Sequence, residues 1–571
     1  MRKSSFDRPS FLTLVLTTIF GWMVGRQWTV LSFGLVTHSL SISKLKASTS
    51  LVGPETIEML SPWKFSQLYS VRASPCEASS ETDSTFDMTT YDAIHQIPWL
   101  IVGGGIHGVH IATRLLGKGP VEKKDICIID DNPELLHKWK TRTAATGMTY
   151  LRSSAGYHLD LEEHSLRHQY GSTPKDYNRP KKKKRRKQKQ KKRKQQNDNI
   201  FSNDYERPRL DIFNHHCDKV IDKYQLNDIH LQGTVIGIEP HDDHVRVVVA
   251  PMKSEMSKKV MYIVENVVLA LGNDCPSYPD WVHSDDVKEG LISHLLDENV
   301  NRDAIDSRKS LEGIASPSAS NTSRKVNSVA VIGGGISAAH KVLEMVRKRN
   351  HAVNNDGDNT YNGSIRLLCR HSLREQQFDT HQDWMMDEAA CKRSLESGGY
   401  GKPSRQRAFS LTSCMTERRQ IIQKERIPGT ITPEINRGKN GLRYAIADGD
   451  VIWSQAEVLS CTRHTLVIDN GFHCTTLELE LSNGEKVNVD KVLLATGFGK
   501  GLPGGNLIKS DLVEQAGLMV SRDGFPIVDE NLSWHQRIYV AGALAELELG
   551  PSARNIAGAR LAAERITSAL I

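Results

Sequence analysis

Two glycine-rich loops carry residue types and spacings that suit dinucleotide binding. Residues 103–108 read GGGIHG and fit the pattern G-x-G-x-x-G, directly after an apolar strand and before a helix. Gly103 permits the tight turn, Gly105 lets the backbone approach a pyrophosphate, and Gly108 lets the helix pack on the sheet. The helix N-terminus adds free N–H groups for the phosphates. This loop therefore predicts a dinucleotide site.

The residues that follow the loops indicate which dinucleotide each one takes. Asp130 ends the next strand after the first loop, at the place where a carboxylate accepts ribose hydroxyls. The second loop, residues 333–338, reads GGGISA and fits G-x-G-x-x-A. The strand after it ends in Arg370 and His371, with no acid. Because an arginine there accommodates a 2′-phosphate, the second loop favours NADPH over NADH, a solvated surface arginine being the alternative.

Two dinucleotide loops in one chain imply that one cofactor passes electrons to the other. A flavin is the usual partner of a nicotinamide, so we expect FAD at the first loop and NADPH at the second. Near the C-terminal side, VAGA at 540–543 and GPSARN at 550–555 supply a strand end and a helix start. These segments would place N–H groups beside a flavin ring, and plain helix capping is the alternative reading.

The elements that must position these loops occur twice. Each half has a short apolar strand, a glycine loop, a helix and a second strand: 99–102, the helix to about 116 and 126–129 in the first half, and 329–332, the helix to about 348 and 365–369 in the second. Alternating β-branched runs then predict an antiparallel meander in each half. We expect an α/β fold with two Rossmann-like domains, the NADPH domain inserted into a discontinuous FAD domain.

The expected domain limits follow from these repeats and from composition. The FAD-binding domain would comprise 97–325 and 496–571, with the NAD(P)H-binding domain at 326–495. Stretches rich in polar residues predict surface insertions at 172–206, 300–325 and 352–363.

The formal charge of +7 originates in one run, because residues 179–194 hold 13 Lys and Arg and no acid. A nuclear localisation signal, an RNA- or membrane-binding patch and a solvated insertion all fit such a run. No aromatic side chains interleave for base stacking, so we favour the solvated insertion and expect no nucleic-acid partner. The nine cysteines form no C-x-x-C, which argues against a redox-active dithiol and a zinc ribbon.

The N-terminal segment has the features of a targeting signal. Basic Arg2, Lys3 and Arg8 precede an uncharged apolar stretch at 9–25. Residues 1–50 therefore predict secretory or organellar targeting or a signal anchor, with possible membrane contact through the apolar stretch. An untargeted tail is the third reading. Residues 51–96, rich in Ser, Thr, Pro and Glu, are expected to be a disordered linker.

Several longer stretches resemble one known group of flavoproteins. They are LRSSAGYHLD, GGGISAA, RHSLREQQFD, ATGF and ALAELELGPSARNIAGAR, found with the first glycine loop. Together they resemble the FAD/NAD(P)-binding proteins related to ornithine and lysine N-hydroxylases and, more distantly, flavin-containing monooxygenases. The resemblance covers about 97–571 apart from the insertions, and its last two long stretches are more specific than the glycine loops.

The resemblance implies roles for matching positions. FAD would be held by Gly103, Gly105, Gly108, Asp130, Arg152, Ser153, Gly542 and Asn555, with Met148 and Leu151 also running past the flavin. NADPH would be held by Gly333, Gly335, Ala338, Arg370 and Gly497.

The implied chemistry is reduction of FAD by NADPH, use of molecular oxygen and hydroxylation of a small amine or amino acid. No set of substrate-amine ligands is matched, so the substrate stays open. An NAD(P)H-flavin reductase or oxidase without oxygen insertion, and a non-catalytic dinucleotide sensor whose basic run binds a partner, are the alternatives.

Polar residues near the expected cleft are the catalytic candidates. They are His158, Asp379 and Asn555, with Asp160, Phe378 and Trp384 as neighbours. A histidine beside an acid is more often structural than catalytic. His381 and Asp383 have no third ligand at metal spacing, so no metal site is expected.

Overall fold

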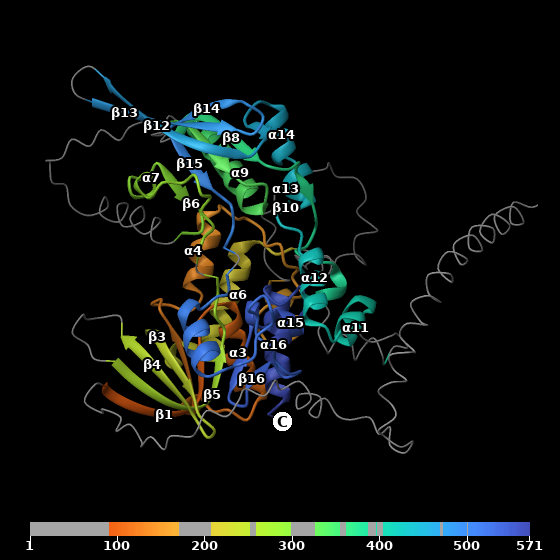
Figure 1. The fold of residues 1–571 in the computed structure, drawn as a ribbon. Coiled ribbons are helices and arrows are strands. Elements are labelled where there is room, and N and C mark those ends of the chain that lie inside the picture. Colours follow the sequence, from red (N-terminus) through yellow and green to blue (C-terminus); the bar gives the residue numbers. More distant parts are fainter. Residues whose placement is uncertain are drawn as a thin grey trace, which may run out of the picture. The chain divides into compact units, whose positions relative to one another are not determined.

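The computed structural model describes residues 91–170, 207–251, 259–273, 275–297, 326–354, 361–385, 396, 403–468, 472–499 and 501–570. The expected targeting segment, the basic run 179–194 and the loop 300–325 lie outside these residues. The described part is a mixed α/β structure with parallel and antiparallel sheets (Figure 1), which confirms the α/β class.

The first sheet has the strand order β1-β2-β3-β4-β5-β17-β16, with β1 also paired to β5. Its strands are β1 (Tyr91–Val102), β2 (Ile126–Asp130), β3 (His230–Pro240), β4 (Val245–Pro251), β5 (Lys259–Leu269), β16 (Ser533–His535) and β17 (Ile538–Val540). β1 runs parallel to β2 and β5, and β17 runs parallel to β5. β4 is antiparallel to both β3 and β5. Leu100, Ile128 and Val267 are fully buried, as expected of strands covered on both faces.

The first strand is longer than its apolar core predicts. β1 begins at Tyr91, so residues 91–96 belong to the sheet and not to the expected linker 51–96. Its first half pairs in parallel with the first half of β5, beginning at Tyr91 opposite Lys259. This extension is held by backbone pairing with β5. Because it has no continuous apolar run, the sequence pattern does not predict it as a strand. The predicted strand 99–102 is only the buried end of β1.

Two helices connect the first glycine loop to the C-terminal segment. α3 (Ile106–Lys118) follows the loop and packs against α16 (Ile556–Ser568). The buried face of α16 is rich in small residues, among them Ala559, Ala562 and Ala563, which allow close approach of the two helices. The late helix expected to complete the first domain thus lies beside its first helix, while the late strand β17 joins its sheet beside β5.

The second sheet is parallel, with the order β11-β8-β7-β15-β6. Its strands are β6 (Ile292–His294), β7 (Val326–Ile332), β8 (Tyr361–Cys369), β11 (Ile452–Gln455) and β15 (Lys491–Leu494), and α9 (Ile336–Asn354) follows β7. β6 corrects the expected boundary at 325, because Ile292 pairs with Val492 in this sheet. Ile292 is fully buried there, so packing in the second core places a segment that sequence order assigned to the first domain.

The remaining elements surround these sheets. β12 (Val458–Ile468), β13 (Phe472–Leu481) and β14 (Lys486–Val489) form an antiparallel sheet, and β9 (Arg374–Glu375) pairs with β10 (Thr430–Ile431). The other α-helices are α4 (His137–Ala145), α5 (Ser165–Tyr170), α6 (Leu210–Lys223), α7 (Ser284–Lys288), α11 (Ser404–Leu411), α12 (Met415–Glu425), α13 (Pro433–Arg437), α14 (Leu442–Ala447) and α15 (Glu546–Leu549). Short 3₁₀ segments are η2 (Lys123–Asp125), η3 (Leu226–Ile229), η4 (Gln382–Met385) and η6 (Gly542–Ala545), and η5 (Leu507–Gln515) is a π-helix.

Among the described helices, none combines the length and the apolar composition needed to cross a membrane.

Candidate functional site

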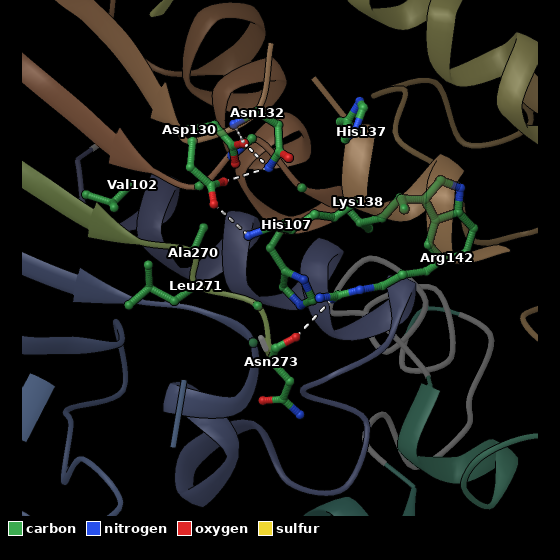
Figure 2. A pocket seen from close by; sticks show the side chains of 18 of the residues that line it. Val102, His107, Asp130, Asn132, His137, Lys138, Arg142, Ala270, Leu271 and Asn273 are labelled. Carbon is green, nitrogen blue, oxygen red and sulfur yellow. Dashed lines mark hydrogen bonds and ion pairs between the residues drawn. The ribbon is translucent and has the colours of Figure 1, made fainter. Parts of the chain in front are cut away.

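A cavity of about 570 Å³ lies where β1, β2 and β5 end, at the first glycine loop. This volume is in the range of small-molecule and cofactor sites. Its walls include the loop at 103–107, residues 130–132 after β2, one side of α4, and residues 270–273 after β5 (Figure 2). Gly542, Ala543 and Arg554 complete the wall from the C-terminal segment. Ligands of parallel sheets bind at this edge.

The glycines of the loop are required for different reasons. Gly103 has φ +112°, and a Cβ there would lie 2.6 Å from the carbonyl oxygen of Ala270. A Cβ on Gly108 would lie 1.8 Å from the carbonyl oxygen of Gly103. The packing of the chain alone therefore requires glycine at these two positions. A Cβ on Gly105 would meet nothing within 4 Å, so no protein atom explains that glycine. The open space beside it fits the backbone approach of a pyrophosphate.

Asp130 lies at the cavity with most of its acceptor capacity already used. Its Oδ2 accepts from the backbone N–H of Gly104 at 2.6 Å, and its Oδ1 accepts from the backbone and side-chain N–H groups of Asn132 at 2.8 and 2.7 Å. A carboxylate has about four acceptor positions, so one remains for a ribose hydroxyl. Asn132, which sequence reasoning missed, fixes the carboxylate in place (Figure 2).

One face of α4 brings two cations to the cavity that no motif predicted. Lys138 and Arg142 are four residues apart and therefore share a helix face. Lys138 pairs with Asp131 at 3.0 Å. Arg142 donates to the carbonyl of Asn273 at 2.9 Å (Figure 2), and its guanidinium lies 5.0 Å from the centre of the Phe498 ring. The one sequence feature that could have identified them is their i, i+4 spacing in the helix after β2.

His107 joins the glycine loop to the C-terminal wall. Its Nε2 is 3.0 Å from the carbonyl oxygen of Ala553, and burial lowers the pKa of the imidazole. Gly542, with φ +66°, lies beside the same ring. Asn555 instead caps α16, where its side chain accepts from the N–H of Gly558 at 3.0 Å. Of the two residues expected beside the flavin here, the structure brings Gly542 to the cavity and uses Asn555 as a helix cap.

Met148 lines the cavity, whereas Leu151, Arg152 and Ser153 do not. Leu151 is buried in the first core, and Ser153 is not among the lining residues. Arg152, 11% exposed, donates to the carbonyls of Gln376 and Phe378 and pairs with Asp379 at 3.1 Å. The arginine thus holds the QFD stretch and does not line this cavity.

His158 and Asp160 form part of a buried structural cluster. His158 Nε2 is 3.0 Å from the carbonyl oxygen of Glu163, and burial keeps its pKa well below the usual value. Its ring packs edge-on against His216. Asp160 accepts from Ser165 at 2.7 Å and pairs with Lys223. Neither residue lines the cavity, so the geometry favours the structural reading of this pair.

The second glycine loop makes the same turn as the first, but other parts of the chain pack closer to it. Gly333 has φ +144°, and a Cβ there would lie 2.5 Å from the carbonyl oxygen of Ala495. Ala338 is buried at the start of α9. A Cβ on Gly335 would lie 3.5 Å from the Cα of Gly429. The ring of His371 lies close to both Gly334 and Gly429, where it would contact a Cβ on either residue. His371 is thus a neighbour of this loop that spacing alone did not identify.

The side chains expected to select the second dinucleotide are accessible. Arg370 is exposed at the end of β8. A second hollow of about 420 Å³ follows directly, lined by Ser372, Leu373, Arg443, Ile446, Ala447 and Trp453. Gly497, with φ +81°, follows β15, and its carbonyl accepts from the N–H of Ser277 at 2.8 Å. Ser337 of the second loop lines the first cavity, so the two loops meet at one site.

No group of three or more potential metal ligands occurs among the residues that the structure describes. His381 lies 3.4 Å from Asp383 and forms a simple pair with it.

No family model and no curated protein matches the chain in sequence. Solved structures do match it over 83% of its length. The ornithine N-hydroxylase of Kutzneria sp. 744, described with reduced FAD, NADP⁺ and L-ornithine, matches over 99% of its own chain with TM-score 0.54 and 16% identity. The ornithine hydroxylase of Pseudomonas aeruginosa matches over 98% with TM-score 0.53 and 15% identity. The chain has the fold of the ornithine N-hydroxylases.

A third structure, the FAD-bound cadaverine monooxygenase of Erwinia amylovora, matches over 92% of its chain with TM-score 0.50 and 16% identity. The resemblance inferred from the motifs is therefore confirmed at the level of the fold.

Proposed function

We propose that the chain is an FAD-dependent, NADPH-using oxidoreductase that hydroxylates a small amine or amino acid. The observation that carries this proposal is Gly105, whose missing side chain faces open space at the head of a cofactor-sized cavity. The shared fold with two ornithine hydroxylases supports the reaction class. We assign the first sheet to FAD and the second to NADPH, with the domain limits corrected for β6.

The residues that would hold FAD are those of the first cavity. The backbone around Gly103 and Gly105 and the free N–H groups at the start of α3 would bind the pyrophosphate, and Asp130 would accept from the ribose. Lys138 and Arg142 would add positive charge from α4. When bound, FAD would supply hydride acceptance and the activation of molecular oxygen.

The residues assigned to NADPH are Gly333, Gly335, Ala338 and Arg370, and we add Arg443 because it lines the hollow that follows Arg370. Their position supports an electron path, because Ser337 of this loop also lines the first cavity. Phe498 lies beside the Arg142 guanidinium at the wall of the cavity and would cover that side of a bound cofactor. The wall residues would thus orient the cofactor and exclude water, both of which favour a defined outcome with oxygen.

The proposal is tested with the purified chain in three steps. The flavin spectrum is recorded, NADPH is added without oxygen, and oxygen is then admitted with a panel of small amines and amino acids. We expect bound FAD, bleaching of its absorbance by NADPH, and a hydroxylated product. Absence of FAD binding would refute the proposal. Bleaching followed by hydrogen peroxide alone, with no product from any amine, would instead support the reductase or oxidase reading.

A further inference from the structure

Arg554 and Glu546 form a partly buried ion pair at the wall of the first cavity. The Nε of Arg554 donates to Oε2 of Glu546 at 2.6 Å. Glu546 is 1% exposed, whereas Arg554 keeps 26% of its side-chain exposure and is one of the residues that line the cavity. Only Nε is used in this pair. Among the described residues, the two terminal amino groups of Arg554 have no hydrogen-bond partner.

Further charged groups lie around this pair. Glu546 is shared, because its Oε1 also pairs with Arg419. Burial lowers the pKa of Arg426, with Asp379 opposing this shift and the charge of Arg554 adding to it. Arg426 also donates to the carbonyl of Pro551 at 2.8 Å. Burial lowers the pKa of Arg554 itself. Arg419 and Arg426 therefore both lie near the pair, with Asp523 and Asp379 as the further acids that act on them.

The start of α16 adds positive potential at Arg554. Arg554 directly precedes Asn555, the N-cap of this 13-residue helix. A helix N-terminus carries partial positive charge, so a cation placed there is unfavourable unless an anion offsets it. Partly buried charge without a full set of partners is costly to the fold, and such groups beside a cleft mark functional sites. The free amino groups of Arg554 thus point to a ligand that the chain itself does not supply.

We infer that Arg554 binds an anionic group of the molecule that occupies the cavity, and that Glu546 is the positioning residue that aims it. The inference rests on the proposed function, because it takes FAD as the occupant. Two parts of FAD are anionic: the pyrophosphate, and the pyrimidine edge of the flavin ring once it is reduced. The glycine loop and the start of α3 already provide for the pyrophosphate. The geometry therefore favours the reduced flavin ring.

The test compares Arg554→Gln, Arg554→Lys and Glu546→Gln in the full chain. The matched control is Glu548→Gln, because Glu548 makes the neighbouring ion pairs to Arg418 and Arg565 at 2.5 and 2.9 Å and does not line the cavity. FAD dissociation constants and the midpoint potential of the bound flavin are measured for each, together with the melting temperature without FAD. The melting temperature separates a loss of folding from a change in the site.

We expect Arg554→Gln to shift the flavin potential to more negative values, because the anionic reduced ring loses its cation. Arg554→Lys should retain part of the wild-type potential. If the pyrophosphate is the partner, Arg554→Gln instead raises the dissociation constant about tenfold, as for loss of one charge-assisted hydrogen bond, and leaves the potential unchanged. Either result supports an anion-binding Arg554 and identifies its partner.

Glu546→Gln distinguishes positioning from simple charge. Loss of one negative charge with Arg554 still in place would move the potential to more positive values. Loss of positioning should move it to more negative values, in the direction of Arg554→Gln, and a positive shift would overturn the role of Glu546. The role of Arg554 is overturned if Arg554→Gln matches Glu548→Gln in both dissociation constant and potential while the wild-type chain binds FAD. A wild-type chain that binds no FAD overturns the proposed function together with this inference.

Discussion

The imidazole of His107 lies 3.0 Å from the carbonyl oxygen of Ala553, across 446 positions of sequence. His107 stands inside the first glycine loop, and Ala553 immediately precedes the arginine that lines the same cavity. Burial lowers the pKa of this imidazole, so it is neutral at pH 7 and donates from Nε2 in the tautomer that makes this bond. This hydrogen bond thus links the two walls of the cavity, in addition to the packing of α3 against α16.

This relationship predicts the effect of removing the imidazole. His107→Leu should destabilise the chain by about 1–3 kcal/mol, because the buried Ala553 carbonyl loses its partner. It should also weaken FAD binding by letting the walls separate. His107→Gln, which can still donate, should recover part of both losses. The measurements are thermal melting and FAD titration, and equal behaviour of the two variants would contradict the role of the hydrogen bond.

The glycine loop should separate cofactor binding from folding. Gly105 has φ −78°, which alanine accepts, and its Cβ would enter open space. Gly105→Ala should therefore change the free energy of unfolding by less than about 0.5 kcal/mol without FAD. FAD binding should nevertheless weaken at least about tenfold, because the methyl group occupies the approach of the pyrophosphate.

Gly108→Ala is the contrasting variant in the same loop. Its Cβ would lie 1.8 Å from a backbone oxygen of Gly103, so the fold itself should be destabilised. Melting temperatures of the two variants, measured with and without FAD, show whether each glycine serves cofactor binding or folding. A large loss of stability in Gly105→Ala without FAD would show that this glycine serves packing.

Buried neutral histidines should make the fold sensitive to acid. Burial lowers the pKa of His110 to about 3 and of His216 to about 4, and it holds the pKa of His158 well below its usual value. In the unfolded chain these groups titrate near pH 6.5, at about their ordinary pKa. The unfolded state therefore binds more protons below that pH, and stability is full above about pH 6.5 and falls as the pH drops toward 4.

Denaturant unfolding measured from pH 7.5 to 4.5 checks this expectation. His216→Gln should reduce the slope of stability against pH over that range, because one proton-linked group is removed. The matched control is His215→Gln at the exposed neighbouring position, which should keep the wild-type slope. Equal slopes in the two variants would rule out His216 as a source of the acid sensitivity.

Choice of nicotinamide should depend on the arginines after β8. Arg370→Ala should weaken NADPH binding far more than NADH binding, because only NADPH carries the 2′-phosphate. Arg443→Ala should act in the same direction if the hollow beside it takes the adenosine end. The control is Arg366→Ala on the same strand, whose guanidinium donates to Glu485 at 3.0 Å. Dissociation constants for both nucleotides are compared, and equal losses would refute the phosphate role.

The sequence predicts those parts of the site that depend on local geometry. A tight turn between a strand and a helix needs particular glycines at particular spacings, and Asp130 follows from the strand that comes next. The turn is present as expected, with Gly103 at φ +112° and Asp130 at the cavity. The fold class follows in the same way, because two such units predict parallel sheets.

The rest of the site depends on contacts between distant segments. Arg142 is held at the cavity by its hydrogen bond to the carbonyl of Asn273, in the loop after β5 and 131 positions away. Arg554 reaches it because α16 packs on α3. Neither contact has a spacing that a single sequence reveals. The same reason explains β6, which joins the second sheet through pairing with β15 and not through its place in sequence order.

The packing of α16 on α3 has a consequence for biosynthesis. The cavity needs residues 103–107 on one side and residues 542–554 on the other, so its walls are made at widely separated times during translation. Until the later segment has left the ribosome, α3 lacks its helical partner and the glycine loop faces water. A nascent chain interrupted before about residue 540 therefore has no complete pocket, however well its first strands have folded. The cofactor proposed for this cavity would therefore bind only after this segment has been released.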